Sequence, residues 1–300
     1  MNDEQLKEME TFAVGMTRQA GAILLEHFQK PLTIEYKSKD QTNPVTDADK
    51  RSEEYLKEAI LKEYPDHSML AEEGSQVDSS SSDFTWVIDP LDGTVNFING
   101  LPIFGVSVGV LQKGQPVLGC IFTPSPGNSK GSVYHARRGG GAFRDDEAIR
   151  VSQDYKPRRG RISIFPAFYA RFFHLKKGFR GEVGELRSLG SVAYELAMTA
   201  SGVIQYSLFG SPWVWDVAAG IILVTEAQGV ALVRREKQRH WEPFRGFTTP
   251  EGDGFGAEEL KEWRSSWIFG GGDMTRFVTS HLTPRSRLEL MLARWLRRWL

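Results

Sequence analysis

The stretch Trp86-Val87-Ile88-Asp89-Pro90-Leu91-Asp92-Gly93-Thr94-Val95-Asn96-Phe97 decides how this chain is built around its candidate site. Its first three residues read as the end of a buried strand, and Pro90 removes a backbone donor where we expect that strand to stop. Asp89 and Asp92 then leave the strand end together. The turn therefore offers two carboxylates, a backbone carbonyl and a hydroxyl, which are ligands that a hard cation prefers.

The same turn also provides backbone donors. Gly93 permits close approach of the backbone, and we expect the amides of Gly93 and Thr94 to lie in the first turn of a short helix, where an anion such as phosphate binds well. An Asp-Gly pair after a strand is commonly an ordinary turn. Ligands for a divalent cation beside free amides nevertheless indicate phosphoryl chemistry.

Two other segments place acids at the ends of predicted elements. Ser68-Met69-Leu70-Ala71-Glu72-Glu73-Gly74 reads as an apolar strand that ends in acids. In Trp213-Val214-Trp215-Asp216-Val217-Ala218-Ala219-Gly220, an acid opens an apolar helix with small residues on its packing face. Acids at three separate element ends can converge in space, as a site for several metal ions requires.

Together with Pro44-Val45-Thr46-Asp47-Ala48-Asp49-Lys50, these motifs resemble the inositol monophosphatase family, within the wider group of Mg²⁺-dependent, lithium-sensitive sugar phosphatases. They occur in the family's order, and the resemblance extends from the N-terminal helix to Phe269. It implies an α+β fold of the sugar phosphatase type, shared with fructose bisphosphatase, in which helices and sheets form a layered αβαβα sandwich. The active site would lie between two subdomains.

The resemblance implies a role for each candidate residue. Glu72, Asp89 and the Leu91 carbonyl would hold a first Mg²⁺, and Asp89, Asp92 and Asp216 would hold a second. The Thr94 hydroxyl would orient the attacking water, with Asp49 as its hydrogen-bond partner and as an outer ligand of a third, weaker Mg²⁺. The catalytic set is Thr94, Asp49 and Glu72, and the set that binds substrate or phosphate is Gly93, Thr94, Asp92, Arg187, Ser191 and Asp216.

Each role has a plainer alternative. Asp49 follows Thr46 by three residues and can act only as a first-turn acid that opposes the helix dipole. Asp47 or Thr46 can cap the helix that follows, and Asp47 is interpreted as the cap and not as a metal ligand. Glu73 is interpreted as an acid that lies behind the metal ligands or faces solvent. Because it is adjacent to Glu72, the choice of which of the two binds the metal stays open. No cysteine or histidine lies in these motifs, so we expect in-line attack by metal-activated water without a phospho-enzyme.

The substrate is the least determined part. Inositol phosphatases of the resembling family place a glutamate seven residues before the helix-opening aspartate, and here that position is Phe209. We expect a small polyol or sugar phosphate such as inositol monophosphate. The alternatives are fructose-1,6-bisphosphatase or 3′-phosphoadenosine 5′-phosphate phosphatase activity on the same metal core, or a binding or regulatory protein that acts through a basic tail.

Composition narrows the class of protein. The chain has 300 residues, 40% hydrophobic and 25% charged, with a net charge of −1, which gives no reason to expect a nucleic-acid partner. The single cysteine, Cys120, excludes an internal disulfide and is expected to be a buried, inert thiol. The polar N-terminus is not a signal peptide and no apolar run approaches a membrane span, so we expect a cytoplasmic protein. We also expect a homodimer.

Periodicity outlines the organisation. We expect an N-terminal subdomain over 1–153 that carries most metal ligands, a C-terminal α/β subdomain over 154–283 that carries Asp216, and a basic amphipathic tail over 284–300. One helical face of the tail would be formed by Leu288, Leu292, Trp295 and Trp299 and would make weak contact with a membrane or a partner. The alternative is a plain C-terminal helix that packs on its own domain or on a dimer mate. The C-terminal half predicts helices over 191–201 and 216–227, and strands over 203–208 and 230–233.

Overall fold

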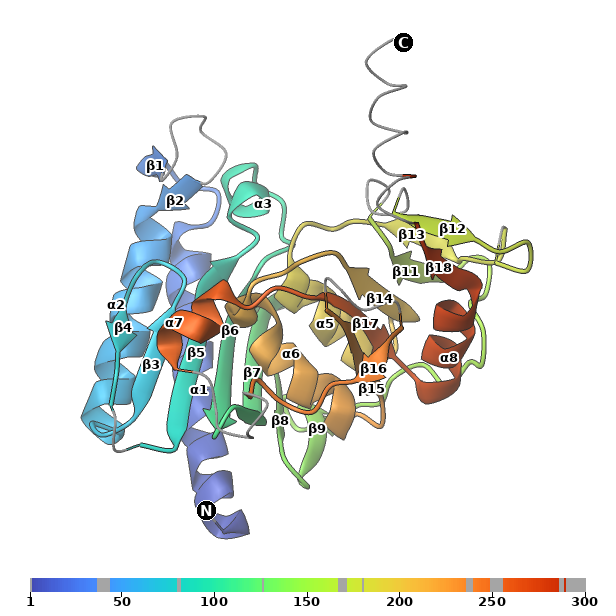
Figure 1. Cartoon of the computed structure of the whole chain (residues 1–300). Helices are drawn as coiled ribbons and strands as arrows, with labels where there is room; N and C mark the ends of the chain where they lie inside the picture. The colour runs from blue at the N-terminus through green and yellow to red at the C-terminus, as the bar shows by residue number, and fades with distance from the viewer. Residues whose placement is uncertain are drawn as a thin grey trace.

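The computed structural model of the chain describes residues 2–36, 44–79, 82–125, 127–166, 172–179, 181–235, 240–248, 256–285 and 289. Helices and sheets alternate in five layers (Figure 1). The layers are α1 (Asp3–His27) with α2 (Asp47–Glu63), the first sheet, α5 (Val192–Ala200) with α6 (Val214–Glu226), the second sheet, and α8 (Gly272–His281). The predicted αβαβα sandwich is confirmed.

The first sheet has eight described strands in the order β10-β9-β8-β7-β6-β5-β3-β4. All neighbours are antiparallel except β3 and β5, which run parallel. The strands are β3 (Ser68–Ala71), β4 (Gln76–Val77), β5 (Phe84–Asp92), β6 (Gly105–Gln112), β7 (Gln115–Ser125), β8 (Asn128–Arg137), β9 (Gly141–Arg144) and β10 (Glu147–Ala148). Since parallel strands end at the same edge, Glu72 after β3 lies near the end of β5.

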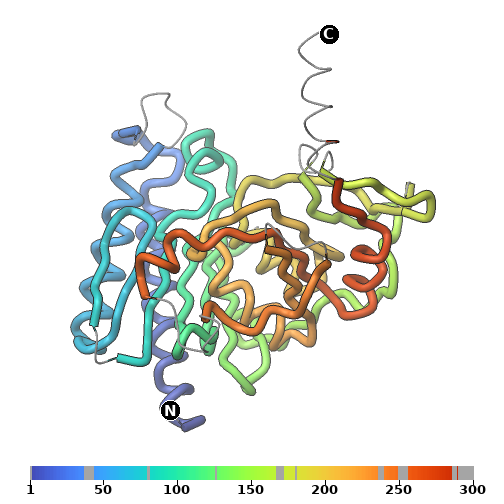
Figure 2. The backbone as a smooth tube through the Cα atoms, in the orientation of Figure 1, coloured from blue at the N-terminus to red at the C-terminus, as the bar shows by residue number. Residues whose placement is uncertain are grey.

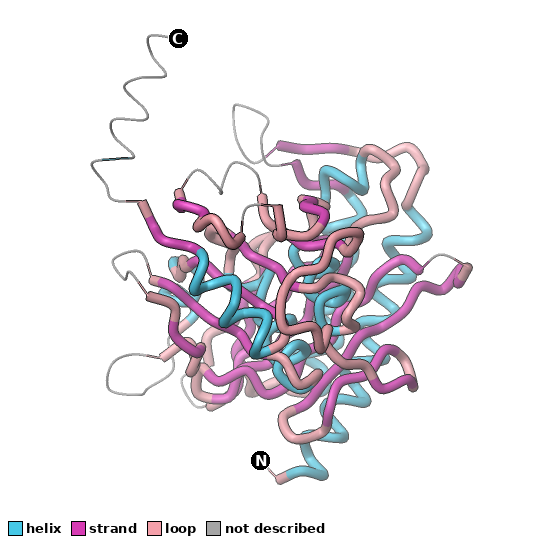
Figure 3. The backbone as a smooth tube through the Cα atoms, turned by 90° about the vertical axis from the view of Figure 1, so that its right-hand side faces the viewer, coloured by secondary structure: helices cyan, strands magenta, loops and turns pink. Residues whose placement is uncertain are grey.

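The second sheet has six described strands in the order β13-β11-β14-β17-β15-β16. They are β11 (Ile162–Ile164), β13 (Glu185–Arg187), β14 (Tyr206–Phe209), β15 (Val230–Arg234), β16 (Glu242–Pro243) and β17 (Ser266–Gly270). In Figure 3, which turns this side toward the reader, α8 lies in front of the second sheet. Two small pairs complete the strands: β1 (Ile34–Tyr36) with β2 (Pro44–Thr46), and β12 (Phe173–Leu175) with β18 (Leu282–Pro284).

Strand β5 combines a buried core segment with the acidic turn. Trp86 and Ile88 face the core beneath α1 and α2, while Val87 faces the core beneath α5 and α6, as the two-residue period of a strand requires. The prediction that the strand stops at Pro90 is wrong. The strand continues to Asp92, with a register shift against β6 between Asp89 and Asp92. Proline is tolerated at such a bulge because the unpaired residue there needs no ladder donor.

Helix α6 lies unusually close to the first sheet, and this position sets the location of Asp216. A Cβ atom on Gly109 of β6 would come within 2.8 Å of the Ala218 Cβ, and one on Gly119 of β7 within 2.4 Å of the Ala219 carbonyl oxygen. The Ser107 hydroxyl donates a 3.0 Å hydrogen bond to a carbonyl in the first turn of the helix. Small residues on both surfaces therefore bring the N-terminus of α6 to the end of β5.

Several local predictions are confirmed and two are wrong. Helices α5 and α6 match their predicted ranges within a few residues. The cap of α2 is Thr46, because its hydroxyl accepts the Ala48 amide, so the interpretation of Asp47 as the cap is wrong. Strand β14 begins at Tyr206 and not at residue 203, since Gly202 has a φ of 72° and Val203 is exposed in the turn after α5.

The path of the chain brings a late segment back to the first sheet. Helix α7 (Ala257–Glu262) contacts β3, although its flanking strands β16 and β17 belong to the second sheet (Figure 2). Among the described helices, none is long and apolar enough to cross a membrane. The helical face predicted from Leu288, Leu292, Trp295 and Trp299 lies outside the described residues and stays a prediction.

Candidate metal centre

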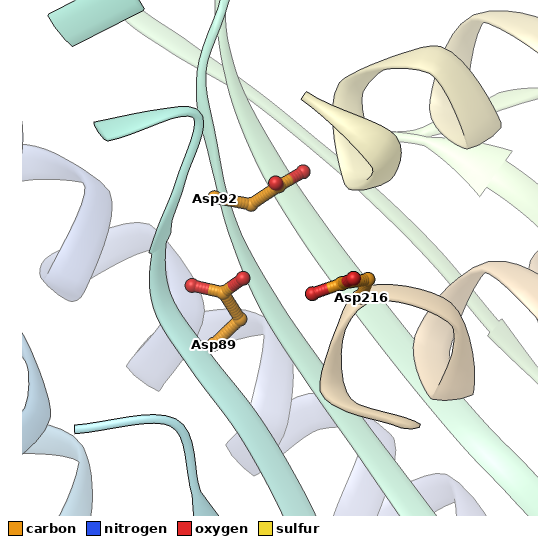
Figure 4. A group of neighbouring side chains, drawn as sticks. All are labelled: Asp89, Asp92 and Asp216. Carbon is orange, nitrogen blue, oxygen red and sulfur yellow. The ribbon is translucent and has the colours of Figure 1, made fainter. Parts of the chain in front are cut away.

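Three carboxylates converge at the end of β5. Asp89 and Asp92 extend from β5, Asp216 extends from the first turn of α6, and the three point toward a common space (Figure 4). One oxygen of each lies within 4.8 Å of the others, close enough to share a metal ion. Asp89 is only 1% exposed. The predicted metal ligands of the central motif and of the α6 motif are therefore brought together from positions more than a hundred residues apart.

Hydrogen bonds from the protein fix the orientation of each carboxylate. Asp89 accepts a bond from one backbone amide two residues on, Asp92 accepts two bonds from the start of α5, and Asp216 accepts one from the amide before α6. These bonds are Leu91 N–H to Asp89 (3.0 Å), the Ser191 hydroxyl and Ala193 N–H to Asp92 Oδ2 (2.7 and 2.5 Å), and Trp213 N–H to Asp216 Oδ2 (2.8 Å). The cluster is thus positioned before any ligand binds.

The electrostatics of the cluster favour a bound cation. Burial raises the pKa of Asp89 and of Asp216 well above the usual range, and the neighbouring acids raise both further. Burial also raises the pKa of Asp92 to about 6, against the opposing hydrogen bond from Ser191. Carboxylates held this close repel one another, and a divalent ion offsets that repulsion. Because the donors are oxygens, the set fits Mg²⁺.

Glu72 and Glu73 influence different acids of the site. Glu72 follows β3, its amide donates to the Ile88 carbonyl (3.1 Å), and its charge raises the pKa of Asp89. The charge of Glu73 instead contributes to the raised pKa of Asp49. The loop that carries both acids is held from α2, because the buried Glu53 carboxylate accepts two of its backbone amides, at residues 73 and 75 (3.0 Å each).

Thr94 and Asp49 meet beside the cluster. Gly93 has a φ of 94°, and a Cβ on it would lie 2.9 Å from the Ile103 carbonyl oxygen, so glycine suits the turn into α3 (Thr94–Ile98). The Thr94 hydroxyl lies 3.4 Å from Asp49 Oδ1 and 3.1 Å from the Leu91 carbonyl oxygen. Burial, opposed by hydrogen bonds from Thr46, raises the pKa of Asp49 to about 6.

The predicted substrate contacts are only partly brought together. Ser191 caps α5 and donates to Asp92, but Arg187 is exposed at the end of β13 and donates to the Leu186 carbonyl. Ser191 also lines a cavity of about 470 Å³ beside the acids. The walls of this cavity are mainly apolar and are formed by Pro166, Phe172, Ser188, Gly190, Ser191, Val192, Glu195, Phe209, Gly210, Ser211 and Pro212.

Two buried acids of the site were missed in the sequence. Glu53 follows Asp49 by four residues and so shares its helix face, a spacing that can be recognised in a sequence. Glu195 lies in the first turn of α5 and accepts the Leu189 amide (2.5 Å). Burial raises the pKa of Glu195 to about 8, so this side chain holds a proton at neutral pH.

The raised pKa values predict a pH-dependent effect of Mg²⁺ on stability. Asp49 and Asp92 have folded-state pKa values near 6, above those of the unfolded chain, so their stabilising contribution is complete below about pH 4 and is lost as the pH rises through 6. We expect the free energy of unfolding of the chelator-treated protein to fall over this range. The increase in melting temperature on adding Mg²⁺ should be larger at about pH 7.5 than at about pH 5. An equal increase at both pH values would contradict metal binding by these acids.

The chain is similar to several known proteins in sequence and in fold. The sequence model of the inositol monophosphatase family matches residues 5–265. A fructose-1,6-bisphosphatase/inositol-1-monophosphatase of Aquifex aeolicus is 34% identical, covering 76% of this chain and 86% of that protein. The Nus factor SuhB of Escherichia coli is 32% identical, covering 74% and 84%. Among solved structures, an inositol monophosphatase of Thermotoga maritima has a TM-score of 0.69 at 26% identity, covering 91% of this chain and 96% of that one.

Proposed function

Because the chain belongs to the inositol monophosphatase family and is a phosphoric monoester hydrolase, we propose that it hydrolyses a small polyol or sugar phosphate with Mg²⁺ held by its acidic cluster. The observation that supports this most strongly is the convergence of Asp89, Asp92 and Asp216 within 4.8 Å. The donor set for the ions would be Glu72, Asp89, Leu91, Asp92 and Asp216, with Asp49 as an outer ligand.

The residues around the cluster would each contribute to hydrolysis. Bound Mg²⁺ would polarise the phosphate, stabilise the leaving oxygen and activate water. The Thr94 hydroxyl would orient the attacking water, and the adjacent Asp49 would fix that hydroxyl. As the water attacks, its proton would pass to the Thr94 oxygen while the hydroxyl proton passes to Asp49. The amides of Gly93 and Thr94 would hold the phosphate oxygens. Ser191 would keep one oxygen of Asp92 occupied, so that the carboxylate presents its other oxygen to the cation.

The leaving alcohol would face the cavity beside Ser191. Phe209 is 4% exposed and packs against Phe269 at a centroid distance of 6.0 Å, so it provides an apolar wall and no acceptor for vicinal hydroxyls. We therefore keep inositol monophosphate as one member of the substrate class. Fructose-1,6-bisphosphate and 3′-phosphoadenosine 5′-phosphate remain the alternatives on the same metal core.

A phosphate-release screen tests the proposal. Inositol phosphates, sugar phosphates and 3′-phosphoadenosine 5′-phosphate are compared with and without Mg²⁺ at neutral pH. We expect release from at least one polyol or sugar phosphate, and its abolition by a chelator. Equal release with and without Mg²⁺, or none from any substrate, would contradict the proposed function. The latter result would favour the non-enzymatic alternative, a binding or regulatory role.

Lithium should inhibit the enzyme uncompetitively. Li⁺ would take the second metal position, built from Asp89, Asp92 and Asp216, once the leaving group has departed. We expect inhibition within tens of millimolar, an order of magnitude set by the weak competition of a monovalent ion for such oxygens. Asp216→Asn should weaken this inhibition together with catalysis. Wild-type activity that does not change over this range of Li⁺ concentration would assign the chain to a lithium-insensitive branch of the family.

We also propose a cellular location, an assembly and a division into subdomains. The protein would be a cytoplasmic homodimer with one active site in each subunit, and each subunit would have subdomains over 1–153 and 154–283. Binding of a membrane or a partner through 284–300 is proposed only as a weak, secondary interaction. A truncated protein that ends at residue 285 should keep its phosphatase activity, because every proposed ligand precedes it.

A further inference from the structure

An arginine stacks on an exposed tryptophan at the edge of the metal centre. The guanidinium carbon of Arg264 lies 3.0 Å from the ring centroid of Trp213. Trp213 is 43% exposed, and its ring stacks on that of Trp215, with a centroid distance of 5.0 Å and an interplanar angle of 7°. The backbone amide of Trp213 is the one that donates to Asp216. The stack therefore adjoins a proposed metal ligand directly.

The α7 segment fixes this arginine in place. Leu260 of α7 is 1% exposed and belongs to the core between the two sheets, against which Trp263 also packs. The Arg264 Nη1 donates to the carbonyl oxygens of Lys261 (3.0 Å) and Trp263 (2.6 Å), at the C-terminal end of α7. Within the part of the chain that the structure describes, Nε and Nη2 have no hydrogen-bond partner. One edge of the guanidinium fork is thus held and the other is available to a ligand.

The positive charge of Arg264 lies close to the proposed metal ligands. Its electrostatic influence reaches Asp216, whose pKa it lowers slightly against the larger effect of burial. Glu262, which lines the same pocket as Arg264, stabilises the positive charge of Arg264 from the α7 side. Once divalent cations occupy the cluster, an anion bound between them and the guanidinium would offset their mutual repulsion. Arginine also binds phosphate and carboxylate through two parallel hydrogen bonds, and an aromatic ring holds the guanidinium plane in position.

We propose that Arg264 is a specificity-determining residue that binds a second anionic group, a phosphate or a carboxylate, on the alcohol part of the substrate. This inference rests on the proposed phosphatase function and narrows its substrate class to polyol or sugar phosphates that carry a second anion. Pro212 lines the cavity beside Ser191 and directly precedes Trp213, so the alcohol would extend from that cavity and place its anion against the Trp213 ring, while the scissile phosphate occupies the metal centre. A purely structural role for Arg264, in which it donates hydrogen bonds to the carbonyl oxygens at the end of α7, requires only Nη1.

Paired substrates test the proposal. Fructose 1,6-bisphosphate and fructose 1-phosphate have the same sugar and the same phosphate at carbon 1, and they differ only in the second phosphate at carbon 6. For the wild type we expect kcat/KM to favour the bisphosphate. Arg264→Gln should reduce kcat/KM for the bisphosphate about 10- to 100-fold, mainly through KM, and for fructose 1-phosphate less than about threefold. Arg264→Lys should recover part of the loss. Arg235→Gln, which removes an arginine that stacks on Trp263 in the same region, is the matched control and should leave the preference unchanged.

Binding without turnover separates this inference from the proposed function. Hexane-1,6-bisphosphonate and hexylphosphonate have P–C bonds and cannot be hydrolysed, so their affinities are measured by calorimetry in the presence of Mg²⁺. The wild type should bind the bisphosphonate about tenfold or more tightly, and Arg264→Gln should abolish the difference.

Three results would overturn the assignment of Arg264: equal losses on both substrates with a lowered melting temperature, an unchanged substrate preference in Arg264→Gln, or equal binding of the two phosphonates by the wild type. Absence of phosphate release from every substrate would instead overturn the proposed function, while the phosphonate comparison still tests Arg264.

Discussion

Asp89→Asn is expected to abolish nearly all turnover while preserving the fold. As the proposed bridging ligand, Asp89 would contact both Mg²⁺ ions, and a neutral amide would leave excess positive charge uncompensated and weaken both sites. We expect kcat to fall on the order of 100-fold or more at saturating Mg²⁺. The melting temperature of the metal-free variant should equal or exceed that of the wild type, because one of several mutually repelling buried acids is removed.

Exposed Asp78 provides the matched control for this substitution. Asp78→Asn removes the same charge from the loop after β4 and should leave both turnover and Mg²⁺ dependence unchanged. Retention of more than about a tenth of the wild-type rate by Asp89→Asn would show that Asp89 is not the bridging ligand.

Thr94→Ala is expected to lower kcat about 100-fold, with KM nearly unchanged. The substitution removes the hydroxyl that lies between Asp49 and the Leu91 carbonyl but keeps the backbone amides that would hold the phosphate. Loss of a group that orients the water and relays its proton to the base typically has effects of about 10²- to 10⁴-fold. Steady-state kinetics at saturating Mg²⁺ separate the two parameters.

Thr94→Ser is the informative companion variant, since it restores the hydroxyl without the methyl group. It should recover most of the wild-type rate. An effect of Thr94→Ala confined to KM, or no recovery in Thr94→Ser, would assign Thr94 to phosphate binding or to packing of α3 and not to activation of water.

Sequence reasoning found the parts of the fold and site that depend on local pattern. The buried apolar run of β5, the acids at the ends of β3 and β5, and the acid that opens α6 are all visible in short windows, because the patterns of strands and helices are local properties. The layered α+β architecture followed from the resemblance that these motifs carry. Burial of Cys120, which is 0% exposed, is also confirmed.

The features of the fold and of the site that sequence reasoning missed depend on tertiary packing. The continuation of β5 beyond Pro90 is set by its pairing with β6, and strand β8 was missed because its first three residues are exposed and polar. Glu53 matters only because the loop after β3 folds onto α2. Arg264 lies in the return of α7 to the first sheet, a contact between segments nearly two hundred residues apart. No local period encodes such contacts, so single-sequence reasoning cannot find them.

The most direct test of the account is a crystal structure of the protein with Mn²⁺ in place of Mg²⁺ and with inorganic phosphate, analysed by anomalous scattering. The account predicts at least two anomalous peaks, one bound by Glu72, Asp89 and the Leu91 carbonyl and one by Asp89, Asp92 and Asp216, with phosphate against the amides of Gly93 and Thr94. Manganese bound elsewhere, or no ion between Asp89 and Asp216 in a crystal of active enzyme, would contradict it.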